Sequence, residues 1–147
     1  NEDHFAIVDL LSKAQIIAIE PKALYYYTHR KSSITTEKFS INSLDDIEAA
    51  QKNHETICRL YPQAIDVAEF RIDLSTLRVI DKIMLSDTFE NEELLDKLIN
   101  KVKKNRNRIL KSRYFTLRRK FAFFILLTTR TLYRWFVREN ARRSWGA

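Results

Sequence analysis

The sequence predicts an α/β segment of one helix and two short strands, followed by a mainly α-helical extension. Three observations support this prediction. Apolar residues recur with helical spacing along most of the chain, two β-favouring runs lie near the N-terminus, and the 147 residues include one glycine and two prolines. So few turn-forming residues favour long helices. The length suits one ordinary domain with a single core.

The N-terminal elements are a helix, two strands and a loop. Apolar residues on a helical period predict an amphipathic helix over residues 2–14. The β-branched and aromatic runs 16–19 and 24–27, joined around Pro21, predict two strands arranged like a hairpin. Residues 29–36 are polar and rich in hydroxyl groups, which is typical of a loop.

Three long helices are expected in the middle of the chain. Ser43 and Asp46 have the spacing of a capping box, which predicts a helix over residues 44–60. A second helix is expected over residues 62–85, with a proline at its tolerated first position. A third is expected from residue 87 to near Leu110. Short connections between them favour antiparallel packing.

The C-terminal stretch 114–137 combines clustered aromatic residues with regularly spaced arginines. Its uncharged run, 121–129, is about half the ~20 residues that cross a bilayer. As one continuous helix it would place apolar residues on one face and arginines on another, which is typical of a helix lying on a membrane surface. The membrane-binding residues expected from this pattern are Phe121, Phe123, Phe124, Leu127, Arg130, Arg134 and Trp135.

The charge is unevenly distributed along the chain. Residues 101–147 carry a net charge of +14 and residues 1–100 a net charge of −7. A basic tail of this kind favours a polyanionic partner, either an anionic membrane or a nucleic acid. The lone Cys58 excludes an intrachain disulfide, and no two of the three histidines have metal-ligand spacing. The sequence therefore predicts no metal site, and its N-terminus does not resemble a signal peptide.

The order of motifs in residues 1–40 resembles the end of the catalytic domain in bacterial family-two GT-A glycosyltransferases. The motifs are an acidic pair in Asn1-Glu2-Asp3, an aromatic strand in Leu24-Tyr25-Tyr26-Tyr27, and a loop in Arg30-Lys31-Ser32-Ser33-Ile34. Enzymes of this family build capsule, exopolysaccharide or cell-wall glycans. The resemblance implies that the chain is the C-terminal part of such an enzyme.

The resemblance also implies roles for individual residues. Asp3 would be the base that accepts the proton of the acceptor hydroxyl, with Glu2 beside it. Arg30, Ser33 and His29 would contact the diphosphate of the donor. A competing interpretation makes the two acids ordinary helix-start residues and the other three side chains parts of a solvated loop.

The resemblance sets expectations for the parent enzyme as well. A family member uses a magnesium or manganese ion, a nucleotide sugar, and a glycan or lipid-linked acceptor. These residues contain no Asp-x-Asp motif, so we expect the chain alone to bind no metal and to be inactive. The expected location is cytoplasmic, at the inner face of the cell membrane.

The sequence divides into an end of the catalytic domain (residues 1–40), a helical extension (41–112) and a basic amphipathic tail helix (113–147). One alternative function is a helical interaction module that forms a homo-oligomer through residues 62–137. Another is a basic module that binds nucleic acid through residues 101–119. The sequence disfavours this last alternative because it contains no recognition motif.

Overall fold

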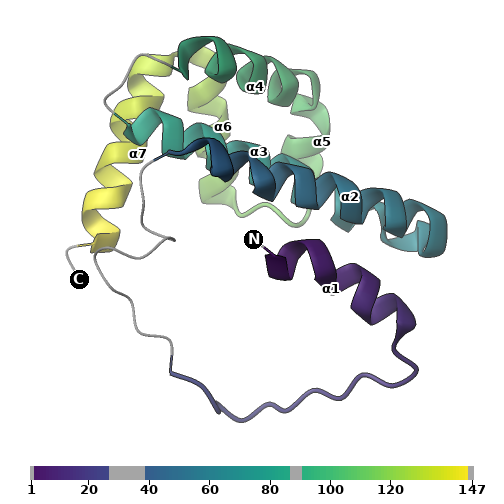
Figure 1. Ribbon diagram of the computed structural model, residues 1–147. Helices are drawn as coiled ribbons and strands as arrows, with labels where there is room; N and C mark the ends of the chain where they lie inside the picture. The colour runs from purple at the N-terminus through teal and green to yellow at the C-terminus, as the bar shows by residue number, and fades with distance from the viewer. Residues whose placement is uncertain (1, 27–38, 87–90, 146–147) are drawn as a thin grey trace.

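The computed structural model describes residues 2–26, 39–86 and 91–145, and their regular structure is helical (Figure 1). The helices are α1 (Glu2–Lys13), α2 (Asp45–Leu60), α3 (Ile65–Leu85), α4 (Glu92–Lys104), α5 (Arg106–Lys111), α6 (Leu117–Thr128) and α7 (Arg130–Trp145). Two short 3₁₀ turns, η2 (Ile41–Leu44) and η3 (Pro62–Ala64), precede α2 and α3. The predicted helices over 2–14 and 44–60 are confirmed within one residue at each end. The predicted helix over 62–85 ends as expected, but its first three residues form the η3 turn and the α-helix begins at Ile65.

The predicted α/β segment is wrong, because no strand forms within the described residues. Residues 14–26 have no regular secondary structure, and the side chains of Ile16 and Ile19 are each 87% exposed. Figure 1 shows this segment running away from the helical body. Strands need neighbouring strands to pair with, and a β-hairpin alone is only marginally stable. Residue 27 and the whole predicted loop, residues 29–36, lie outside the described residues.

The third predicted long helix is divided into α4 and α5 at Asn105. The side chain of Asn105 donates a hydrogen bond to Oδ1 of Asp73 on α3 at 2.8 Å. Asparagine has a low helix propensity because its side chain finds such alternative partners. The helix therefore breaks at the residue whose side chain donates a hydrogen bond to the buried Asp73.

The tail is a helical hairpin rather than one continuous helix. Thr129 is extended (φ −145°, ψ 131°), and its hydroxyl accepts a hydrogen bond from the backbone N–H of Leu132 at 3.1 Å. This contact caps the start of α7. The chain reverses there, since Arg118 on α6 bonds to Asn140 on α7 at 2.5 Å. The hairpin packs onto the helical body through contacts of α7 with α3.

Helix α3 is at the centre of the core. It contacts α2, α4 and α7, and its Leu77 and Ile80 are fully buried. Apolar side chains from five further elements complete the same cluster. The members contributed by α4 to α7 include Leu95, Ile99, Val102, Ile109, Phe123, Leu126, Tyr133 and Val137. Burial of this apolar area is the main force that holds the helices together.

A polar network crosses the core between α3 and the tail hairpin. The buried hydroxyl of Tyr133 donates to Oδ1 of Asp81 at 2.5 Å, and Arg119 Nη1 lies 2.6 Å from the other carboxylate oxygen. Burial raises the pKa of Asp81 despite the opposing influence of Arg119 and the Tyr133 hydroxyl. Burial and the neighbouring Asp81 likewise raise the pKa of Tyr133 above its ordinary value. The network fixes the hairpin in one register on α3.

Candidate functional site

Helix α1 carries the acidic pair, and a polar cluster joins it to the helical body. Nδ1 of His4 lies 2.9 Å from Oδ1 of Asp46 on α2. Nη2 of Arg71 on α3 lies 3.3 Å from the same oxygen and 3.1 Å from Nδ1 of His4. Asn53 on α2 donates to the backbone carbonyl of His4 at 2.6 Å. Three elements therefore meet at His4, one residue after Asp3.

The charge of Asp46 suits this anchoring role. Partial burial alone would raise its pKa, but the nearby Ser75 hydroxyl, the hydrogen bond with His4 and the positive charge of Arg71 outweigh burial. The net effect is a pKa below the ordinary aspartate value. Asp46 is thus ionised at neutral pH, where it attracts Arg71 and accepts the hydrogen bond from His4.

Further contacts hold α1 along its length. Lys52 on α2 pairs with Asp9 at 3.0 Å and donates to the backbone carbonyl of Phe5 at 3.3 Å. A cavity of about 340 Å³ lies under α1, between apolar side chains such as Val8, Ile57 and Val67. The helix is therefore anchored mainly through polar contacts at its edges.

The structure places the predicted site residues in different surroundings. Asp3 is exposed at the start of α1, and Glu2 belongs to the same helix. His29, Arg30 and Ser33 lie outside the described residues. The described residues contain no group of three or more His, Cys, Asp or Glu side chains that could hold a metal ion.

The predicted membrane-binding residues fall into two groups. Phe121, Phe124 and Trp135 are exposed by 60%, 56% and 62%, whereas Phe123 is 1% exposed and Leu127 packs against the core. Phe123 is therefore a core residue, and its neighbours Ala122, Ile125 and Leu126 on α6 are buried in the same core cluster.

The two predicted membrane-facing arginines are paired within the fold. Arg130 forms an ion pair with Asp96 and lies 3.9 Å from Glu92 on α4, and Arg134 lies 3.6 Å from Glu92. These contacts join the start of α7 to α4. None of the helices in the described ranges is both long and apolar enough to span a bilayer.

The exposed apolar face also includes two residues outside the predicted set, Leu117 and Leu132. Leu117, Phe121 and Phe124 follow one another at spacings of four and three residues along α6, on the side opposite the core. The rings of Phe121 and Phe136 meet edge to face at 6.4 Å, which joins this side of α6 to α7. Had the break at Thr129 been predicted, the apolar periodicity of α6 and that of α7, taken separately, would have identified this face.

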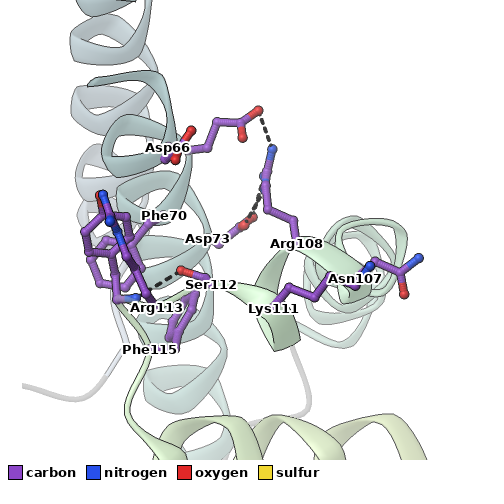
Figure 2. Close-up of a pocket in the computed structure, with 11 residues that line it drawn as sticks. Asp66, Phe70, Asp73, Asn107, Arg108, Lys111, Ser112, Arg113 and Phe115 are labelled. Carbon is purple, nitrogen blue, oxygen red and sulfur yellow. Dashed lines mark hydrogen bonds and ion pairs between the residues drawn. The ribbon is translucent and has the colours of Figure 1, made fainter. Parts of the chain in front are cut away.

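A second cavity, of about 500 Å³, lies between α3 and the segment that runs from α5 to α6. Figure 2 shows Phe70 and Arg113 on one side of it, Arg108 on the other, and Asp73 between them. Arg108 donates to both carboxylate oxygens of Asp73 at 2.8 Å, and its Nη1 lies 2.8 Å from Glu69. These hydrogen bonds raise the pKa of Arg108 and keep it charged.

No family model, curated protein or solved structure matches this chain.

Proposed function

We propose that the chain is the acceptor-side end of a bacterial family-two glycosyltransferase, which moves a sugar from a nucleotide sugar to a glycan or lipid-linked acceptor. The observation that carries the proposal is the exposed Asp3 at the start of a helix that is fastened at the next residue, His4. The motif order of residues 1–40 supports the same family.

Asp3 is the proposed catalytic base. A carboxylate that accepts the acceptor proton must be reachable by the acceptor hydroxyl and held at a defined distance from the reacting carbon. Exposure of Asp3 meets the first requirement. The contacts of His4 with Asp46, Arg71 and Asn53 favour the second, because they restrict the first turn of α1. Glu2 is proposed to orient the acceptor beside it.

The donor half of the proposed reaction belongs to another part of the enzyme. The sequence contains no Asp-x-Asp motif, so the magnesium or manganese ion of the family would be held elsewhere. His29, Arg30 and Ser33 are proposed to reach the donor diphosphate. The exposed apolar side chains of residues 16–26 would then pack against the rest of the enzyme, which removes them from water.

The role of Asp3 is tested by Asp3→Asn in the protein that joins this chain to a nucleotide-sugar-binding domain. We expect the transfer rate to fall by about 10²- to 10⁴-fold, the usual contribution of a general base, while donor affinity is unchanged. Asp9→Asn is the matched control, because Asp9 lies on the same helix and pairs with Lys52 on the partly exposed surface. A transfer rate of Asp3→Asn equal to that of the unmodified enzyme would refute the role of Asp3.

The tail hairpin is the proposed membrane-binding surface. Its exposed apolar face consists of Leu117, Phe121, Phe124, Leu132 and Trp135. Arg118 and Lys120 flank the α6 part of this face, and Arg142 is exposed near the end of α7. Apolar side chains bordered by cations complement an anionic lipid surface, where each charge contributes about 1 kcal/mol. The enzyme would thereby lie at the inner face of the cell membrane.

Vesicle flotation tests this surface. The double variant Phe121→Ser/Phe124→Ser should lose binding to vesicles that contain phosphatidylglycerol, and high salt should weaken binding of the unmodified chain. The matched control is Leu60→Ser/Tyr61→Ser, which changes two exposed apolar residues at the end of α2. Unchanged flotation of the first variant would contradict the proposal.

One observation favours a second candidate, a helical interaction module. The same apolar face of α6 and α7 could pair with its copy in a homodimer. A mass that doubles with concentration in the absence of lipid would support this candidate. A nucleic-acid role is disfavoured, because Arg108, Arg119, Arg130 and Arg134 are paired with carboxylates inside the fold.

A further inference from the structure

The cavity in Figure 2 lies apart from the proposed transfer site on α1. Its volume of about 500 Å³ falls within the range of roughly 300–1,000 Å³ that small-molecule sites occupy. We infer that this cavity binds one neutral sugar residue of a glycan, with the sugar ring packed on Phe70 and Tyr114 and its hydroxyl groups bonded to the charged wall opposite.

Aromatic rings form one side of the cavity. The rings of Phe70 and Tyr114 lie 5.4 Å apart with a tilt of 38°, and both side chains are half-buried. The buried Phe115 supports Phe70 from behind with an edge contact at 4.7 Å. The Arg113 guanidinium lies over the Tyr114 ring, with its central carbon 5.1 Å from the ring centroid, and its Nη2 donates to the Tyr114 hydroxyl at 2.9 Å. The platform is therefore fixed before a ligand arrives, and a pyranose offers a flat C–H face to such rings.

The opposite wall is charged but largely neutralised. Asp73 is buried, and its two oxygens accept hydrogen bonds from Asn105 and Arg108 at 2.8 Å. The remaining terminal nitrogen of Arg108 pairs with Glu69. This internal pairing leaves the exposed Asp66 and Lys111 at the rim as an acceptor and a donor for ligand hydroxyl groups.

The balance of charges in the cavity favours a neutral sugar over other classes of ligand. The walls carry three acids and three bases: Asp66, Glu69, Asp73, Arg108, Lys111 and Arg113. A phosphate would lie close to carboxylates, and a cation close to guanidinium groups, so neither gains net attraction. A hydrocarbon ligand would displace the water that is hydrogen-bonded to Asp66 and Lys111 and would offer no hydrogen bonds in its place. A neutral polyol with an apolar face uses both walls.

The sugar site deepens the proposed function. That the bound glycan is the acceptor rests on that function. A sugar residue held at this cavity would tether the acceptor chain to the enzyme at a point separate from Asp3. Binding itself does not require the donor domain, so it can be measured on the 147-residue chain.

The test is a titration of this chain with the methyl glycosides of glucose, galactose, mannose and N-acetylglucosamine, followed by amide chemical shifts. At least one glycoside should give saturable shifts confined to residues 66–73 and 107–115. Tyr114→Ala should weaken that affinity about tenfold, because it removes the stacking ring. Tyr114→Phe keeps the ring and should weaken it less than about threefold. Tyr61→Ala, a tyrosine outside the cavity, should leave it unchanged.

Asp66→Ala provides a second test that does not depend on the aromatic packing, because Asp66 is exposed on α3. It should weaken binding about threefold without lowering the stability of the fold. The inference is overturned if no glycoside gives saturable shifts up to about 100 mM, or if inorganic phosphate binds the same residues more tightly. Absent sugar binding together with loss of transfer in Asp3→Asn would overturn this inference alone and leave the proposed function standing.

Discussion

Removal of the Tyr133 hydroxyl by Tyr133→Phe should destabilise the protein by about 2 kcal/mol. Tyr133 is fully buried, and its hydroxyl donates to Asp81 at 2.5 Å. A hydrogen bond to a charged group contributes about 1.5–3 kcal/mol to stability. Because Arg119 still pairs with Asp81 in the variant, the loss should stay within that range rather than reach the ~3–5 kcal/mol of an unpaired buried charge.

The assay is urea unfolding at pH 7, with a thermal melt beside it. We expect a lower midpoint at an unchanged m value, and a melting temperature lower by about 6 °C for a chain of this size. Tyr114→Phe is the matched control, since the Tyr114 hydroxyl is bonded to the exposed Arg113 and its loss should cost less than about 0.5 kcal/mol. Equal stability of Tyr133→Phe and the unmodified chain would refute the view that this network fixes the hairpin.

The pH dependence gives a further check on the same network. Burial raises the folded-state pKa of Asp81, so the folded state binds a proton more tightly than the unfolded state does. Stability attributable to Asp81 therefore increases as the pH falls from the folded-state pKa towards the ordinary aspartate value. The Tyr133 hydroxyl lowers the pKa of Asp81, so its loss in Tyr133→Phe raises that pKa further. The variant then gains more stability on protonation, and the difference in unfolding free energy between Tyr133→Phe and the unmodified chain should narrow as the pH falls. A gap that widens on acidification would contradict this assignment.

Four further predictions concern polar contacts of Asp46, Asp73 and Arg134. Asp46→Ala should speed amide exchange in α1 about tenfold and leave α3 unchanged, because the anchor of His4 is lost; equal rates in α1 would contradict the anchoring role. Since the pKa of Asp46 is lowered, its stabilising effect is present at neutral pH and should disappear as the pH falls through its folded-state pKa. Asp73→Ala should cost about 1.5–3 kcal/mol in urea unfolding, because Asn105 and Arg108 lose their buried acceptor while Arg108 keeps its ion pair with Glu69; a cost below 1 kcal/mol would contradict this. Arg134→Gln should cost less than about 1 kcal/mol, and the difference should vanish in 1 M salt; a salt-independent loss would indicate a packing role instead.

The local signals in the sequence predicted the helices over 2–14, 44–60 and 62–85 correctly. Their apolar residues keep one period over many turns. Helices α2 and α3 bury apolar residues in the core, whereas Leu10 and Leu11 on α1 stay exposed by 64% and 44%. The runs 16–19 and 24–27 have β propensity, but propensity alone does not form a strand. A strand needs a partner, and the described residues provide none.

The candidate membrane surface was predicted only in part, because the break at Thr129 was missed. Thr129 lies in an apolar stretch without glycine or proline, and its capping role depends on the reversal that it helps to form. A single long helix would place Phe123 and Leu127 near the lipid, whereas the hairpin buries Phe123 and exposes Phe124. The pairing of Arg130 and Arg134 with α4 likewise depends on tertiary structure that periodicity does not encode.

The candidate cavity beside α3 was also missed, for the same physical reason. Its walls come from residues more than thirty positions apart, such as Asp73 and Arg108. Neither residue belongs to a recognisable motif, and Asp73 on its own reads as a polar interruption of an apolar helical face. A buried acid in the middle of a predicted core face was the available signal that a basic partner lies opposite.

The central claim is that Asp3 is the base of a glycosyl transfer. The most direct measurement is the single-turnover rate of sugar transfer by Asp3→Glu and Asp3→Asn in the enzyme that contains this chain. Asp3→Glu keeps a displaced carboxylate and should retain a partial rate that declines on acidification. Asp3→Asn should lose the rate by about 10²-fold or more and show no such decline. Full activity of Asp3→Asn with the pH profile of the unmodified enzyme would contradict the claim.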